Sequence, residues 1–123
     1  MQPLSENMNQ IDRKTLQLVF RAIRTAFKRS DAYKLIKAEN ESFDVGTRGG
    51  KRWFCAFCGV SHIEVEVDHY PKPVIALDRK WFTYSVDEFY GSVFFLPCRV
   101  LCKPCHKLET KNQNQMRKQF RKG

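Results

Sequence analysis

Two pairs of cysteines, each pair separated by two residues, are the residues with the clearest chemistry: Cys55-Ala-Phe-Cys58 and Cys102-Lys-Pro-Cys105. A two-residue gap lets one tight turn present both thiolates to the same ion, and structural zinc takes four such ligands in a tetrahedron. The two pairs therefore predict one four-cysteine zinc site that joins two distant parts of the chain. The fifth cysteine, Cys98, is expected to be a small buried apolar residue, with a spare zinc ligand as the alternative.

Three further residues have the chemistry of a second metal site. Asp68 and His69 follow the first cysteine pair by a short stretch, and His106 directly follows the last cysteine. One carboxylate and one imidazole can hold a divalent ion and leave positions open for water and a phosphate oxygen. The unperturbed pKa of histidine, about 6.5, suits His69 to act as a general base near neutral pH. Zinc that ties the two cysteine pairs together would bring Asp68 and His106 to one place.

The elements that must position these residues follow from periodicity and capping signals. Apolar residues at three- and four-residue spacing predict a helix over about residues 9–29, and Ser30-Asp31 then caps a second, short helix. Alternation over residues 63–67 predicts a half-buried strand that ends at Asp68-His69. A short capped helix is expected from Ser85, a short strand at residues 99–101, and a final helix from about Pro104, which carries His106 near its start.

The composition limits the class of protein. The chain has 123 residues and a formal net charge of +9, and no apolar run approaches the roughly 20 residues that span a bilayer. The polar N-terminus has no apolar signal core, and five cysteines fit a secreted disulfide framework poorly. We therefore expect a cytoplasmic protein without membrane contact, and a polyanion such as nucleic acid as its partner.

The positions of the basic residues add to this expectation. One hypothesis is that the helical N-terminal segment is a solvated basic hairpin that covers the core, and the other is that its cations contact phosphates. Under the second hypothesis, cations of this segment, of the Gly-rich connector at residues 44–52 and of the final helix bind DNA. The residues expected to do so are Arg21, Arg24, Lys28, Arg48, Lys51, Arg52, Lys111, Arg117 and Lys118.

The combination and order of three segments resemble the HNH endonucleases, a family with a ββα-metal active site. These segments are Cys55-Ala-Phe-Cys58, Val65-Glu-Val-Asp68-His69 and the stretch from Leu101 through Cys102-Lys-Pro-Cys105-His106 to residue 111. The resemblance covers about residues 53–112, and basic chains of this size are similar to phage-encoded members. It implies an α+β fold in which a basic helical extension (residues 1–44) precedes an HNH nuclease domain (residues 45–123) with a structural four-cysteine zinc site.

The resemblance also implies an activity. His69 would deprotonate a water molecule, and Asp68 and His106 would hold a catalytic divalent ion, Mg²⁺ or Mn²⁺, with Ni²⁺ or Zn²⁺ as further candidates. The substrate would be double-stranded DNA in the cytoplasm, of a bacterial host if the chain is phage-encoded, and the protein a monomer or weak dimer. The family's middle Asn falls here near Pro97, so we expect either that another residue braces the catalytic loop or that the activity is weak. Two alternatives stay open: a non-catalytic, zinc-stabilised DNA-binding accessory protein, and a structural interaction protein.

Overall fold

The computed structural model describes residues 12–42 and 51–122, which form an α+β fold. The helices in these ranges are α2 (Arg13–Lys28), α3 (Asp31–Glu39), α4 (Val86–Phe95) and α5 (Lys103–Lys122), with a short 3₁₀ helix η1 (Trp81–Thr83). The strands are β1 (Trp53–Phe54), β2 (Ser61–His62), β3 (Val65–His69) and β4 (Cys98–Cys102). Strand β1 pairs with β2 and β3 with β4, both antiparallel. The predicted α+β class is confirmed.

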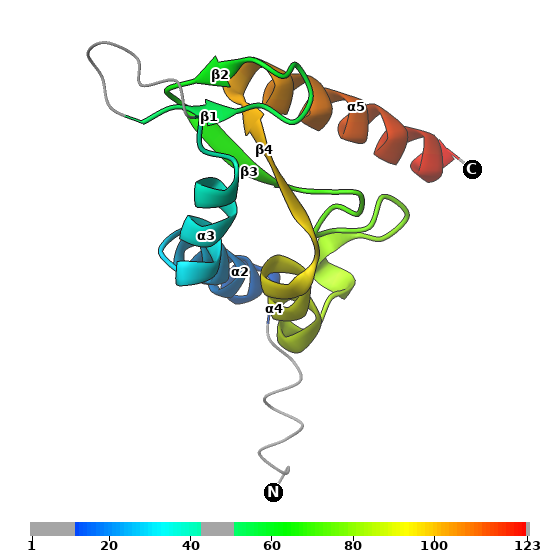
Figure 1. The fold of residues 1–123 in the computed structure, drawn as a ribbon. Helices are drawn as coiled ribbons and strands as arrows, with labels where there is room; N and C mark the ends of the chain where they lie inside the picture. Colours follow the sequence, from blue (N-terminus) through cyan, green and yellow to red (C-terminus); the bar gives the residue numbers. More distant parts are fainter. Residues whose placement is uncertain (1–11, 43–50, 123) are drawn as a thin grey trace, which may run out of the picture.

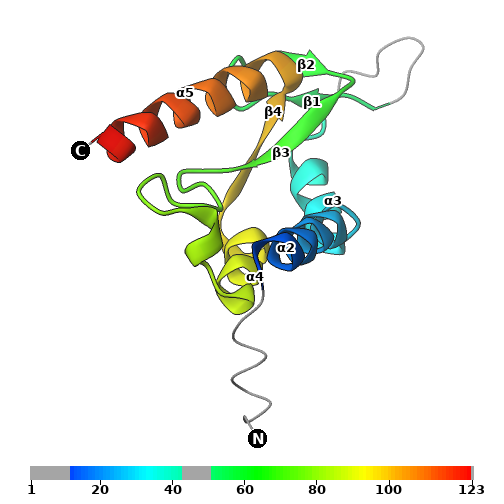
Figure 2. The same ribbon diagram turned by 180° about the vertical axis from the view of Figure 1, so that it is seen from behind.

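The β3–β4 ribbon connects two groups of elements. Figure 1 shows α2, α3 and α4 gathered at one end of this ribbon, and the β1–β2 hairpin with the start of α5 at the other. Figure 2 shows the same arrangement from behind, with α5 extending away from the ribbon. The register pairs Asp68 with Arg99 and His69 with Cys98. Both predicted site residues of β3 therefore lie at the end of the ribbon that is nearer α2, α3 and α4.

The two N-terminal helices begin at capping residues. Asp12 accepts a hydrogen bond from the backbone of Thr15 at 2.8 Å, and Ser30 accepts one from the backbone of Tyr33 at 3.2 Å. Each cap satisfies a backbone N–H that has no partner inside its helix. The second predicted helix is confirmed as α3. The first begins at Arg13 in the described residues, rather than near residue 9, because Asp12 is in an extended conformation.

A shared apolar core joins the N-terminal helices to the rest of the fold. Leu16, Phe20 and Phe27 of α2 pack in one cluster with residues that include Phe89 and Val93 of α4. The rings of Phe20 and Phe89 are stacked with centroids 3.9 Å apart. The N-terminal helical segment therefore covers a core to which its own apolar residues contribute. The expected boundary between residues 44 and 45 lies outside the described residues.

Helix α4 has a clear start and a clear end. Ser85 and Glu88 form a reciprocal capping box, which confirms the predicted capped helix. The helix ends at Phe95 because Leu96 precedes Pro97, and a residue before proline is biased away from the helical conformation. Leu96 is accordingly extended, with φ −68° and ψ 144°.

One expectation about apolar residues differs from the structure. Alternation predicts Ile63 in the half-buried strand, but β3 begins at Val65 and Ile63 is 52% exposed. The final helix has few apolar residues to anchor it, and all three of these, Leu108, Met116 and Phe120, are exposed. Polar contacts hold α5 instead, since Arg117 donates to the backbone carbonyls of residues 75 and 76. None of the helices in the described ranges combines the length and the apolar character needed to cross a membrane.

Candidate metal centres and cavity

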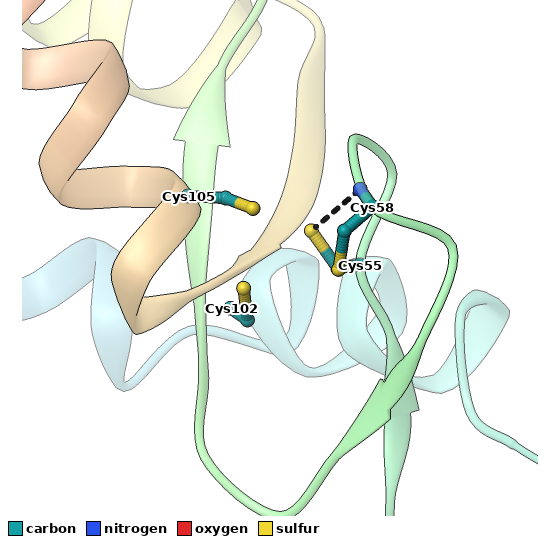
Figure 3. Close-up of side chains that lie close together, drawn as sticks. All are labelled: Cys55, Cys58, Cys102 and Cys105. Atoms are coloured by element: carbon teal, nitrogen blue, oxygen red, sulfur yellow. Dashed lines mark hydrogen bonds between the residues drawn. The ribbon is translucent and has the colours of Figure 1, made fainter.

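The four cysteines predicted to bind zinc lie close together at the N-terminal end of α5. The Sγ atoms of Cys55, Cys58, Cys102 and Cys105 all lie within 4.8 Å of one another. Figure 3 shows one pair in the loop after β1, Cys102 at the end of β4 and Cys105 in the first turn of α5. Four thiolates at this spacing suit a tetrahedral zinc ion with Zn–S bonds of about 2.3 Å. The expected metal-binding cluster is confirmed, and Cys98 lies outside it.

The first cysteine pair is shaped for metal binding by its own backbone. The N–H groups of Phe57 and Cys58 each donate to Sγ of Cys55 at 3.4 Å. Burial opposes ionisation of Cys55, but backbone N–H groups outweigh it and lower its pKa to about 6. Gly59, directly after the pair, has φ +74°, a left-handed conformation that favours glycine. A zinc ligand must be deprotonated, and these N–H groups favour the thiolate of Cys55.

Asp68 and His106 are brought together, as the sequence predicted. Oδ1 of Asp68 lies 4.0 Å from Nε2 of His106, and its Oδ2 accepts a hydrogen bond from Nε of Arg99 at 3.2 Å. Arg99 is also 3.5 Å from a carboxylate oxygen of Glu109. The ion pair with Arg99 leaves one oxygen of Asp68 facing His106. Bonds of a divalent ion to N and O are about 2.0–2.3 Å long, so one ion can contact both atoms.

Glu66 orients the imidazole of His106. Its Oε2 lies 2.7 Å from Nδ1 of His106, on the side of the ring opposite Asp68. Because an ionised carboxylate can only accept a hydrogen bond, Nδ1 carries the proton and the lone pair of a neutral ring lies on Nε2. Carboxylate, histidine and metal in this order are common in metalloproteins, where the carboxylate fixes the tautomer and makes the histidine a better ligand.

His69 is held by a backbone carbonyl of α4. Its Nε2 lies 2.8 Å from the carbonyl oxygen of Val93, and its ring packs beside Phe27 at 5.5 Å between centroids. A carbonyl can only accept, so Nε2 carries the proton and Nδ1 keeps its lone pair. Burial lowers the pKa of His69, and the charge of Arg24 adds to this effect against the opposite influence of Val93 and Asp68. The ring is therefore neutral near pH 7, the form that can accept a proton.

Pro97 explains why the Val93 carbonyl is free to bind His69. In a helix this carbonyl would accept from the N–H four residues later, which is the position of Pro97, and proline has no N–H. The carbonyl oxygen of Pro97 in turn accepts from the backbone N–H of Tyr70 at 2.9 Å. One residue thus frees the acceptor for His69 and fixes the chain directly after it. Pro97 therefore braces the segment that carries His69.

A cavity of about 560 Å³ lies over these residues. Its lining includes His69 and His106, and cations of the N-terminal helices line it as well. Asp68, whose side chain is 12% exposed, is not among the described lining residues. Both histidines therefore line one cavity together with cations of α2, α3 and the start of α5. These cations are Arg24, Lys28, Lys37 and Lys103.

The structure separates the cations expected to bind DNA. Arg24 and Lys28 line the site cavity, whereas Arg117 lines a second cavity on the other part of α5. Lys51 lies 3.9 Å from Glu41, and Arg52 borders a shallow hollow near His62. Of the other four cations, Arg21, Lys111 and Lys118 are exposed, and Arg48 lies outside the described residues.

Sequence reasoning missed four contributors to the site. The alternation predicts Glu66 only as a solvent-facing residue, although it stands two residues before Asp68 on the same strand face. Arg99 faces Asp68 only through the strand register, which the sequence leaves open. Val93 and Pro97 contribute through backbone groups. Their spacing in the sequence was a usable signal, because a proline four residues after Val93 cannot donate an N–H to the carbonyl of Val93.

Comparisons with known proteins give no match: no family model, no curated protein and no solved structure is similar to this chain.

Proposed function

We propose that the chain is a metal-dependent endonuclease of the HNH kind that hydrolyses phosphodiester bonds of DNA. One observation carries the proposal: His69 and His106 line one cavity, Asp68 lies 4.0 Å from His106, and each histidine has one ring nitrogen fixed by an acceptor. Each neutral ring therefore has a defined tautomer, with its lone pair on Nδ1 of His69 and on Nε2 of His106.

The roles follow from the free atoms. Nδ1 of His69 takes a proton from a water molecule, which then attacks phosphorus, and the Val93 carbonyl stabilises the imidazolium that forms. Oδ1 of Asp68 and Nε2 of His106 are the two ligands for a divalent ion. Such an ion, when bound, neutralises charge that develops on the phosphate and the leaving oxygen. Oxygen and imidazole donors together suit Mg²⁺ or Mn²⁺ and also accept Ni²⁺ or Zn²⁺.

The surroundings support a phosphate substrate. Arg24, Lys28 and Lys37 line the same cavity as the histidines. His106 lies in the first turn of α5, and the first turn of a helix attracts anions because its N–H groups have no acceptor inside the helix. The anionic backbone of DNA supplies the complementary charge, in agreement with the net charge of +9.

The experiment is a plasmid cleavage assay with zinc-loaded protein and added Mg²⁺ or Mn²⁺. We expect nicked product, and we expect His69→Ala to lower the rate by about 10²–10⁴, the usual contribution of a general base. His62→Ala is the matched control, because His62 is the third histidine and is not among the residues that line the site cavity. His62 contacts Sγ of Cys58 at 3.5 Å, so the zinc content of this variant is measured as well. This control should cleave at the wild-type rate.

Two results would overturn the proposal. One is an intact plasmid with every divalent ion tried, although the protein is folded, holds zinc and binds DNA. That result would favour the non-catalytic DNA-binding accessory protein. The other is equal cleavage by wild type and His69→Ala, which would point to a contaminating nuclease.

A further inference from the structure

A second and larger cavity, of about 1030 Å³, lies between α5, the segment around η1 and the start of α2. It shares no described lining residue with the site cavity. Four cations line it and have no carboxylate partner within ion-pair distance in the described residues: Arg13, Lys80, Arg117 and Arg121. We call this cavity the basic cleft.

The charge of the basic cleft is largely uncompensated. Asp78 is the only carboxylate among its described lining residues. A further cation of the lining, Arg79, is already paired with Glu88 at 2.8 Å. Arg13 and Lys80 approach the same ring, that of Phe82, at 3.6 Å and 5.8 Å from its centroid. Like charges gathered in this way repel one another, so an anion in the cleft would relieve the repulsion.

No opposite charge accounts for two of these positions. Arg13 is the first residue of α2, whose first turn has no acidic residue, and a cation at a helix N-terminus opposes the helix dipole. Arg117 is held by backbone carbonyls, with Nη2 2.9 Å from the oxygen of Ile75 and Nη1 3.5 Å from that of Ala76. Neutral acceptors fix its guanidinium and leave its charge available to a ligand.

The basic cleft and the site cavity are close enough to share one polyanion. Arg24 lines the site cavity and Arg117 lines the basic cleft. Burial, and after it the charge of Arg117, lowers the pKa of Arg24, so the two guanidinium groups affect each other. Helix α5 runs from His106 at the site to Arg121 at the cleft, a distance of about 22 Å at 1.5 Å per residue. A DNA duplex covers that distance with roughly six or seven base pairs at about 3.4 Å each.

We propose that the basic cleft is a second binding site for the sugar-phosphate backbone of a DNA duplex whose reacting phosphate lies beside His69. This inference rests on the proposed function for the nature of the polyanion. The cleft would hold phosphates on one side of the cut, so that duplexes of fewer than about six base pairs could not reach both places.

The test compares two triple variants of equal charge. Arg13→Gln, Lys80→Gln and Arg121→Gln together remove three cations of the cleft, and Arg29→Gln, Lys34→Gln and Lys107→Gln remove three exposed cations that line neither cavity. Binding of duplex DNA is measured by fluorescence anisotropy at several salt concentrations, and thermal melts confirm that both variants are folded. The measurement needs no cleavage.

The cleft variant should bind at least tenfold more weakly than the control variant. Its slope of log K against log salt should also fall by about 2–3, near 0.9 for each phosphate that the variant no longer neutralises. On duplexes too short to span the site and the cleft, the difference between the two variants should be smaller, because one duplex cannot bind both places at once. Equal affinities of the two variants on long duplexes, or no binding of DNA by the wild type, would overturn the inference. A chain that binds as expected but never cleaves would overturn the proposed reaction alone.

Discussion

His69 and His106 present opposite ring nitrogens because different groups hold them. Val93 accepts from Nε2 of His69, whereas Glu66 accepts from Nδ1 of His106. The tautomer of a neutral imidazole is set by the hydrogen bond that one nitrogen makes. One ring is therefore arranged to take a proton and the other to bind a metal, although both belong to the same residue type.

Pro97→Ala tests whether the missing N–H determines the state of His69. The new N–H can donate to Val93, lengthen α4 and compete with Nε2 of His69 for the carbonyl. We expect cleavage to fall by about tenfold to a hundredfold, a part of the 10²–10⁴ that general-base catalysis contributes. Nitrogen NMR of the imidazole should show a mixture of tautomers where the wild type has one.

Pro104→Ala is the control for this change. Pro104 lies in the first turn of α5, where an added N–H has no partner inside the helix. The control should keep wild-type cleavage and the wild-type NMR spectrum. An unchanged His69 tautomer and unchanged cleavage in Pro97→Ala would show that Val93 binds His69 for another reason.

At the scale of elements, local signals located most of the fold. The Ser30 cap and the Ser85 capping box marked the starts of α3 and α4, and the two cysteine pairs located the metal cluster. The β1–β2 hairpin was missed because each strand has two residues, too few to show alternation. The groups that orient the two histidines were missed, because a contact between β3 and α5 and a backbone carbonyl supply them.

The glycines at residues 59 and 91 provide a prediction at this scale. Neither would bring an added Cβ within 4 Å of another group, so space does not decide the outcome. Gly59→Ala should destabilise the fold by about 1–2 kcal/mol because Gly59 has φ +74°. Gly91→Ala, within α4, should stabilise it by about 0.5–1 kcal/mol, since glycine costs that much inside a helix.

Urea denaturation of the zinc-loaded protein measures both changes. The opposite signs make each variant the control for the other, because both add one methyl group to the chain. A Gly59→Ala variant as stable as the wild type, or more stable, would mean that the turn after Cys58 tolerates a side chain in its left-handed conformation.

At the scale of the whole molecule, the described residues contain two apolar clusters of unequal size. The larger combines α2, α4 and their neighbours, while the smaller consists of Cys55, Leu101 and Cys102, with Cys105 packed against it. Three of these four residues are predicted metal ligands. The end of the molecule that carries the β1–β2 hairpin therefore depends on metal more than on apolar packing.

Loss of zinc should consequently destabilise the protein by several kcal/mol, a part of the roughly 10–16 kcal/mol that structural zinc contributes in small domains. A strong chelator should lower the melting temperature, and Cys58→Ser should do the same. Cys58 is exposed, so its substitution removes a ligand with little loss of packing. Metal analysis and thermal melts are the measurements.

Cys98→Ser is the matched control, since Cys98 lies outside the four-cysteine cluster. Burial, followed by the charge of Asp68, raises its pKa to about 11, so it stays a thiol at neutral pH. This variant should keep its zinc. If Cys98→Ser lost the metal and Cys58→Ser retained it, the assignment of ligands would be wrong.

The cysteine cluster also makes the chain a closed ring between Cys58 and Cys102 when metal is bound. The stretch at residues 71–72 lies on this ring and is exposed. A backbone break there would open the ring without dividing the molecule, since both fragments would remain attached to the same ion. His69 would then stay on one fragment and Val93 on the other, with the metal as their common anchor.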